Sequence, residues 1–358
     1  MFKSIGYFLI CFIATTFSVT AQKPQDPVNT SAYISEDVTF KNEPDNITLT
    51  GTLTIPKNKT GFPTVILISG SGPQDRNSEL LGHKPFLVLA DDLTKKGIAV
   101  LRVDDRGTGG TEGIYNDTGL DGFNRDTKAA IRYLKSRAEI TSSKIGLLGH
   151  SLGGITAPMI AAETDDVAFV VMLAGPGISG EELMLLQKEN FERKMGVPEA
   201  AIASGKKNIA GVYSIIKNSD ADRLKLQAEV KAYFTQLYGT AITADQLNTL
   251  SEQLTWPWFS DFIKYDPSII LPKVKCPILA INGSNDIQVS AKENLAGIKE
   301  LAEKANNHNV TVMEFPKLNH LFQESETGLP QEYAKIEQTF SPEVLNAISD
   351  WILKLPTI

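Results

Sequence analysis

The sequence predicts an α/β fold in which a mostly parallel central sheet is covered by helices on both faces. Continuous apolar runs of strand length recur along the chain, and amphipathic stretches, among them residues 86–96 and 124–137, lie between them. Strands that are apolar on both faces and alternate with helices are typical of a parallel sheet buried between two helical layers. The 358 residues suffice to bury a full core. The predicted strands are residues 64–69, 98–103, 144–149, 167–174, 277–282 and 310–315.

Three different patterns precede this alternation. Residues 1–21 combine a lysine, an apolar run and small residues before Gln22, which predicts a signal peptide and export to the periplasm or beyond. A membrane anchor is the alternative, but the apolar run is short for a bilayer, so no stable membrane insertion is expected after cleavage. Residues 22–37 are polar with two prolines and predict a flexible lead-in. Residues 47–55 alternate apolar residues with threonine, as antiparallel strands at a sheet edge do.

The alternation of strands and helices is interrupted once, over residues 178–271. This stretch contains helical patterns and an aromatic cluster with Trp256 and Trp258, and it is too long for a loop. It therefore predicts a helical cap inserted into a core formed by residues 38–177 and 272–358. The two tryptophans either pack the cap onto the core or contact the substrate, and the sequence leaves both roles open.

Charge and cysteine content exclude several classes of function. The net charge is -7 and no Lys/Arg-rich run occurs, so nucleic-acid binding has little electrostatic support. Removal of residues 1–21 would leave Cys276 as the single cysteine, so no intramolecular disulfide is possible. No cofactor or metal is expected.

The strongest motif is Gly-His-Ser-Leu-Gly at residues 149–153, which follows an apolar strand and precedes a predicted helix. A sharp strand-to-helix turn holds its serine in a strained backbone geometry that only small neighbours tolerate, and Gly149 and Gly153 supply that room. The turn would lift the Ser151 hydroxyl above the sheet to a helix N-terminus, where partial positive charge favours an oxyanion. The motif in this setting predicts that Ser151 is a nucleophile.

A serine hydroxyl needs a base, and on this kind of turn the acid and the histidine follow the serine along the chain. The chain has four histidines. His83 precedes Ser151, His150 adjoins it within the turn, and His308 lies before the last predicted strand. His320 follows that strand, at the edge of the sheet where active sites of open parallel sheets form. His320 is therefore the predicted base.

The predicted acid is Asp286, which comes just after the preceding strand on a turn rich in Gly, Asn and Ser. There it could hold the tautomer of the His320 imidazole and stabilise the imidazolium. A plain turn aspartate is one alternative, because Asn-Asp is also common turn chemistry. Glu181 and Glu182, which follow an earlier strand, are the competing acids.

An oxyanion hole needs two backbone donors. The amide of Leu152, directly after the nucleophile, should be one of them. The other should come from residues 69–76, a loop whose glycines let the backbone approach a substrate closely. The Ser71 amide is the predicted second donor, and the Gly72 amide is the alternative.

Residues 149–154, 69–76 and 101–109 together resemble bacterial α/β-hydrolases, most of all the exported esterases often labelled dipeptidyl-aminopeptidase or acylaminoacyl-peptidase-like. This resemblance implies the α/β-hydrolase fold, with an inserted cap, from about Val38 to the C-terminus. One departure is that the family usually has His-Gly where this chain has Ser69-Gly70. The triplet at residues 104–106, Asp-Asp-Arg, is expected to form an ion-paired structural turn.

These observations predict a serine carboxylesterase that hydrolyses small short-acyl esters through an acyl-enzyme intermediate. An exopeptidase or acylaminoacyl-peptidase with the same Ser151, Asp286 and His320 is the alternative. A non-catalytic binding protein on a hydrolase scaffold is a third possibility, which is weakened because all three triad positions are filled in the expected order.

Overall fold

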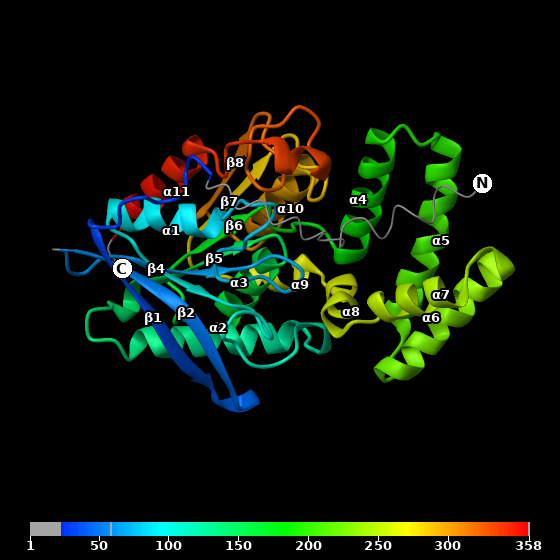
Figure 1. Cartoon of the computed structure of the whole chain (residues 1–358), viewed down its shortest axis with the longest axis horizontal. Coiled ribbons are helices and arrows are strands. Elements are labelled where there is room, and N and C mark those ends of the chain that lie inside the picture. The colour runs from blue at the N-terminus through cyan, green and yellow to red at the C-terminus, as the bar shows by residue number, and fades with distance from the viewer. Residues whose placement is uncertain (1–22, 58, 357–358) are drawn as a thin grey trace.

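The computed structural model describes residues 23–57 and 59–356, so the predicted signal peptide lies outside the described residues (Figure 1). Within them one sheet has the strand order β1-β2-β4-β3-β5-β6-β7-β8. β1 and β2 form an antiparallel pair, β2 joins β4 antiparallel, and the remaining pairs are parallel. The strands are β1 Tyr33–Asn42, β2 Ile47–Pro56, β3 Thr64–Ile68, β4 Ala99–Val103, β5 Ile145–His150, β6 Val170–Leu173, β7 Ile278–Gly283 and β8 Val310–Phe315.

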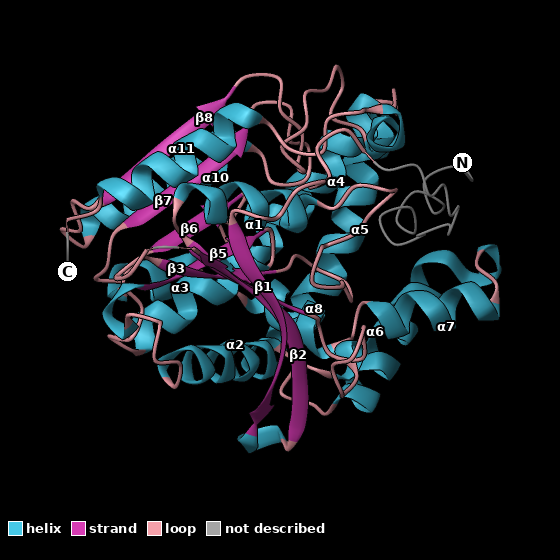
Figure 2. Ribbon diagram, turned by 60° about the vertical axis from the view of Figure 1, so that its left-hand side comes forward, coloured by secondary structure: helices cyan, strands magenta, loops and turns pink. Residues whose placement is uncertain are grey.

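Helices cover both faces of this sheet because its strands are apolar on both sides (Figures 1 and 2). Side chains alternate between the faces, so Val65 and Leu67 of β3 join one buried cluster and Ile66 joins the other. α1 (Pro85–Lys96) and α11 (Pro342–Lys354) pack on the first face. α2 (Leu120–Lys135), α3 (Gly153–Glu163) and α10 (Ala291–Lys304) pack on the second. The mostly parallel α/β-hydrolase fold is thereby confirmed.

The flexible lead-in predicted for residues 22–37 is wrong for its described part. β1 begins at Tyr33, whose buried ring places its hydroxyl 2.9 Å from Asp91 Oδ1. Further upstream, the Gln25 amide oxygen accepts from the amides of Thr339 and Phe340, and its Nε2 donates to the Phe340 carbonyl. These backbone groups would otherwise lack a partner, so the segment is held against the C-terminal part of the chain.

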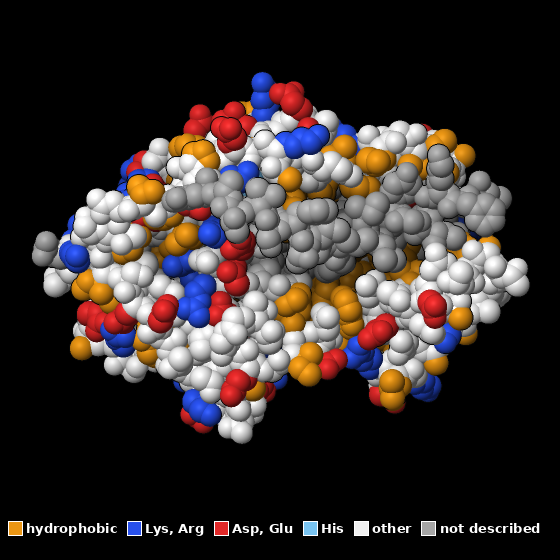
Figure 3. Space-filling model, viewed as in Figure 1, with side chains coloured by type: hydrophobic (Ala, Val, Ile, Leu, Met, Phe, Trp, Pro, Cys, Tyr) orange, Lys and Arg blue, Asp and Glu red, His pale blue; other side chains and the backbone are white. Residues whose placement is uncertain are grey.

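The interval between β6 and β7 is helical, as the sequence predicts, and lies to one side of the sheet (Figure 1). Its buried side chains belong to the same cluster as the first face of the sheet, so the cap shares the core instead of forming one of its own. In Figure 3 hydrophobic side chains gather at the centre of the face, between the core and these helices. The helices are α4 Gly180–Lys194, α5 Glu199–Asn218, α6 Arg223–Tyr238, α7 Ala244–Gln253, α8 Pro257–Lys264 and α9 Pro267–Ile270.

No helix among residues 23–57 and 59–356 combines the length and the apolar character needed to cross a bilayer.

Two residues of the triplet at 104–106 form ion pairs, in keeping with the structural role that the sequence predicts: Asp104 pairs with Arg76, and Arg106 has two acidic partners. The Arg106 guanidinium pairs with Asp126, at 2.6 Å, and with Asp45. Asp45 has a second cation, because Arg125 Nε lies 2.9 Å from its Oδ1. Arg106 thus ties the turn after β4 to α2 and to the hairpin between β1 and β2.

Replacing this cation tests its structural role. Arg106→Met should lower the free energy of unfolding by about 3 kcal/mol, the lower end of the range for a buried pair, because Asp126 loses its cation while Asp45 keeps Arg125. Arg125→Met is the matched control, since its side chain is 40% exposed and should cost no more than about 1 kcal/mol. Urea unfolding measures both, and equal effects of the two substitutions would contradict the prediction.

Candidate active site

Ser151 lies at the sharp turn between β5 and α3. Its φ is +53°, in the left-handed region that a non-glycine residue rarely occupies. The backbone around it is crowded: a Cβ on Gly149 would lie 1.9 Å from the Gly153 carbonyl oxygen, and one on Gly153 would lie 2.4 Å from the Ile68 carbonyl oxygen. The turn therefore tolerates only glycine at both positions, which is the reason the sequence motif has this form.

The structure joins His320 to Asp286. Nδ1 of His320 lies 2.8 Å from Oδ2 of Asp286, and the carboxylate is fully buried while the imidazole is 7% exposed. The other carboxylate oxygen accepts from the backbone amides of Gln288 and Val289, at 2.8 and 2.9 Å. Both oxygens have partners, so the orientation of the carboxylate is fixed and the imidazole presents Nε2 away from it.

The turn that carries His320 is held by buried side chains. Asn319 Oδ1 accepts from the amides of Leu321 and Gln323, and its Nδ2 donates to the Gln323 side chain. Phe322, fully buried, stacks on Phe340 with ring centroids 5.4 Å apart. These contacts set the backbone of the histidine turn independently of the Asp286 contact.

His150, the residue before Ser151, connects two turns: residues 149–153, which we call the nucleophile turn, and residues 319–323, which we call the histidine turn. Its ring lies 4.8 Å from the His320 ring between centroids, and its Nε2 lies 2.9 Å from the His320 carbonyl oxygen. A carbonyl only accepts, so Nε2 carries the proton of a neutral imidazole. Desolvation and the nearby His320 lower the pKa of His150 to about 3, which keeps it neutral. Sequence reasoning assigned His150 no part in the site, because its contact crosses between distant segments.

Ser151 follows His150 in the chain, and His150 contacts His320. Among the described residues, no hydrogen bond joins Ser151 Oγ to the His320 imidazole. In free hydrolases this hydrogen bond is often long and tightens only when substrate binds.

The backbone amides of Leu152 and Ser71, the two predicted donors, have no acceptor within the described chain. The alternative donor is engaged, because the Gly72 amide donates to the Tyr115 hydroxyl at 3.1 Å. Ser71 is exposed whereas Gly72 is buried. The loop also approaches the nucleophile closely, since a Cβ on Gly70 would lie 3.3 Å from Ser151 Cβ. This geometry favours Ser71 over Gly72 as the second donor.

Asp105 holds both ends of this loop, which we call the oxyanion loop (residues 69–74). Ser69 Oγ donates to Asp105 Oδ1 at 2.6 Å, and the Gln74 amide donates to Oδ2 at 2.9 Å. Desolvation raises the pKa of Asp105 to about 7, although these two hydrogen bonds oppose the shift. Ser69 thus has a carboxylate partner at the position where the family usually has histidine.

The competing residues lie in other settings. Glu181 is in the first turn of α4 and pairs with Lys217 of α5 at 2.6 Å. His83 is buried with its ring nitrogens 2.9 Å from the Thr339 hydroxyl and from the Tyr333 carbonyl. His308 is exposed. None of these side chains contacts His320 or Asp286 within the described residues.

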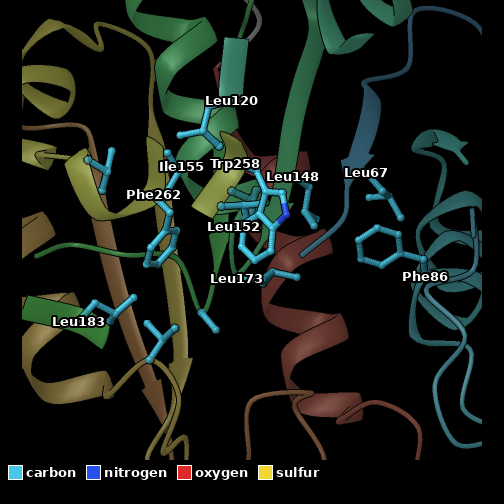
Figure 4. Close-up of a cluster of buried hydrophobic side chains, with 14 of the residues drawn as sticks. Leu67, Phe86, Leu120, Leu148, Leu152, Ile155, Leu173, Leu183, Trp258 and Phe262 are labelled. Atoms are coloured by element: carbon cyan, nitrogen blue, oxygen red, sulfur yellow. The ribbon is translucent and has the colours of Figure 1, made fainter. Parts of the chain in front are cut away.

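Of the two cap tryptophans, Trp258 is 3% exposed and belongs to the buried cluster, where Figure 4 shows it among core side chains such as Leu120 and Leu152. The ring centroid of its indole lies 6.1 Å from that of Trp256, and Trp256 is only partly buried. Trp258 is therefore a packing residue, and Trp256 remains the candidate for substrate contact. In the part of the chain that the structure describes, no cluster of His, Cys, Asp and Glu has the geometry of a metal site.

A family described as serine aminopeptidase S33 matches residues 84–326, which include the nucleophile turn and the histidine turn. The chain belongs to this family. It is accordingly a serine hydrolase of the α/β-hydrolase superfamily, in agreement with the resemblance seen in the sequence.

Two kinds of relatives extend this result. Esterase EstD of Thermotoga maritima is 29% identical over 332 residues, which cover 92% of this chain and 70% of that protein. Among solved structures, Est1E of Butyrivibrio proteoclasticus, recorded with ferulic acid bound, has a TM-score of 0.53 at 18% identity and covers 88% of this chain and 98% of its own. Esterase Pf2001 of Pyrococcus furiosus has a TM-score of 0.52 at 18% identity, covering 94% and 98%. At 18% identity, the likeness to these two structures shows the fold alone.

The neutral His150 gives a pH-dependent stability that can be measured. Its pKa is about 6.5 in an unfolded chain and about 3 in the fold, so between these values the unfolded state binds the extra proton and stability falls as the pH falls. From about pH 8 to about pH 5 this group alone should remove about 2 kcal/mol of stability. Over the same pH interval, the free energy of unfolding of His150→Gln should therefore fall by about 2 kcal/mol less than that of the wild type. Urea unfolding at the two pH values measures this difference.

His308→Gln is the control, because His308 is exposed and makes no contact with the site. It should keep the wild-type difference between the two pH values. If His150→Gln kept that difference as well, the assignment of the neutral state to His150 would be refuted.

Proposed function

We propose that this protein is a carboxylesterase that hydrolyses small short-acyl esters with Ser151, His320 and Asp286 as its catalytic triad. The observation that carries the proposal is the 2.8 Å contact between His320 and Asp286, placed beside the strained turn of Ser151 by His150. Membership of a serine hydrolase family and the likeness to a protein named as an esterase support the reaction class.

In the proposed reaction, Ser151 Oγ attacks the ester carbonyl carbon while His320 Nε2 accepts its proton. Asp286 stabilises the imidazolium that forms. The negative oxygen of the tetrahedral intermediate accepts hydrogen bonds from the amides of Leu152 and Ser71. The intermediate collapses, and His320 returns the proton to the departing alcohol, which leaves an acyl group on Ser151. Water then attacks the acyl carbonyl while His320 accepts its proton; the bond to Ser151 Oγ breaks, His320 returns the proton to Oγ, and the acid is released.

The cap supports a small substrate in this proposal. The cap contacts residues 115–120, whose Tyr115 binds the oxyanion loop, and Trp256 of the cap is only partly buried. The apolar indole of Trp256 would suit a short acyl or alcohol group. The family's description as an aminopeptidase favours cleavage of aminoacyl amides as the second candidate, which would use the same triad.

The first prediction from this proposal concerns Ser151. Ser151→Ala should abolish nearly all turnover of p-nitrophenyl acetate and butyrate, and a fluorophosphonate should label the wild type at Ser151 alone. Labelling that persists in the alanine variant would refute the nucleophile. Comparison of p-nitrophenyl esters of increasing chain length with aminoacyl-p-nitroanilides distinguishes the two substrate classes. A higher kcat/KM for the anilides would make the protein a peptidase.

The second prediction separates the candidate acids. Asp286→Asn should leave the fold intact and lower kcat by about 10⁴-fold, because an amide on His320 Nδ1 favours the wrong tautomer. Glu181→Gln should have near-normal activity, since its partner is Lys217 on a cap helix. Ester hydrolysis by both variants, with circular dichroism as the check of folding, provides the measurement. The opposite order of activities would transfer the acid role to Glu181.

We also propose export, on the pattern of residues 1–21. N-terminal sequencing of the protein from a bacterial host should find Gln22 as the first residue.

A further inference from the structure

The oxyanion loop has no regular secondary structure and is held by two side chains that come from the segment after β4. Asp105 binds its ends, at Ser69 and Gln74. Tyr115 binds its middle: the hydroxyl accepts from the Gly72 amide at 3.1 Å and faces the Gly70 carbonyl oxygen at 3.4 Å. Ser71 lies between these two contacts, and no acceptor for its amide is found within the described chain.

The contact with Gly70 determines where the Ser71 amide points. The Gly70 carbonyl and the Ser71 N–H belong to one planar trans peptide unit, so they point in opposite directions. The Tyr115 hydroxyl lies inside the protein and donates to the Gly70 oxygen. The Ser71 N–H therefore points the other way, away from the interior. The hydrogen bond from the Gly72 amide fixes the next peptide unit as well. Together the two contacts prevent rotation of either peptide plane about Ser71.

Tyr115 is itself held by the cap. Its ring stacks on Phe123 of α2 at 4.7 Å between centroids, and the indole of Trp258 from α8 meets it edge-on at 6.2 Å. Two other cap residues contact the same short segment, residues 115–120. Asp261 Oδ2 accepts from the Leu120 amide at 2.9 Å, and Arg223 pairs with Asp117 at 2.6 Å.

Burial of the Tyr115 hydroxyl indicates that the two loop contacts matter. The residue is 5% exposed, and burial, with the nearby Asp105 carboxylate, raises the pKa of its phenol well above the usual value. A buried hydroxyl costs free energy unless it is hydrogen-bonded, and the partners available to this one are the backbone groups of Gly70 and Gly72. A phenylalanine would fill the same space between Phe123 and Trp258 without that cost.

We propose that Tyr115 is the positioning residue of the oxyanion hole, and that through Trp258 it makes the alignment of the Ser71 amide depend on the docked position of the cap. The inference rests on the proposed function, because it assigns the Ser71 amide to an oxyanion. Tyr115 does not touch the substrate. It acts by holding the peptide units on either side of Ser71.

Tyr115→Phe is the direct test, because it removes the hydroxyl and keeps the ring between Phe123 and Trp258. We expect kcat for p-nitrophenyl butyrate to fall about 10- to 100-fold with KM nearly unchanged, since loss of one whole oxyanion donor costs about 10²–10³-fold in kcat. Binding of a trifluoromethyl ketone, which forms an oxyanion on Ser151, should weaken by a similar factor. The melting temperature should stay close to that of the wild type.

Tyr33→Phe is the matched control. It also removes a tyrosine hydroxyl, but that hydroxyl binds Asp91 of α1 and makes no hydrogen bond to the oxyanion loop among the described residues, so its loss should not affect kcat. Equal kinetics of Tyr115→Phe and wild type would overturn the proposal. So would a loss in Tyr115→Phe that appears only in KM or only in the melting temperature.

A double-mutant cycle tests the link to the cap. Trp258→Phe keeps an aromatic ring in the cluster but withdraws the indole from Tyr115, and it should lower kcat in the wild-type background. In the Tyr115→Phe background the same substitution should have a much smaller effect, because the hydroxyl through which it acts is gone. Additive effects would refute the coupling. Fluorophosphonate labelling of Ser151 in all four proteins separates these outcomes from failure of the proposed function, since an unlabelled wild type would refute both.

Discussion

The close approach of two backbone segments at Ser151, the turn after β5 and the chain that leaves β3, is the constraint on which the site depends. The turn after β5 packs so tightly under the oxyanion loop that a Cβ on Gly153 would lie 2.4 Å from the Ile68 carbonyl oxygen. Gly70 lies directly against Ser151 from the other side. Glycine at these positions permits this close approach, and Ser151 between them has a left-handed φ of +53°.

The remaining groups of the site come from strands that are far apart in the sequence. Asp286 follows β7 and His320 follows β8, and their side chains meet because the carboxyl ends of parallel strands lie at one edge of the sheet. Each turn has its own internal support: backbone amides bind the free oxygen of Asp286, and Asn319 fixes the turn of His320. His150 then joins the histidine turn to the nucleophile turn. The positions of Asp286 and His320 are therefore fixed by hydrogen bonds to neighbouring residues.

The cap is energetically part of the core. Many of its buried side chains continue the cluster on one face of the sheet, and three of its contacts with the core fall on residues 115–120. That segment carries Tyr115, whose hydroxyl binds the middle of the oxyanion loop. A cap packed in this way affects more than access to the pocket, because a change in its position reaches the backbone that is proposed to bind the oxyanion.

The sequence by itself determined the features that depend on local pattern. Runs of apolar residues set the strands, because both faces of a parallel sheet are buried, and the glycines around Ser151 set the nucleophile turn, because only they fit it. The chain order of Ser151, Asp286 and His320 followed from the order of the strands. The tertiary structure alone decided the rest. Gln25 is held to the C-terminal segment, His150 contacts His320, and the Tyr115 hydroxyl accepts from the Gly72 amide. These contacts join residues that are distant in the chain and follow no periodicity, so no local pattern could reveal them.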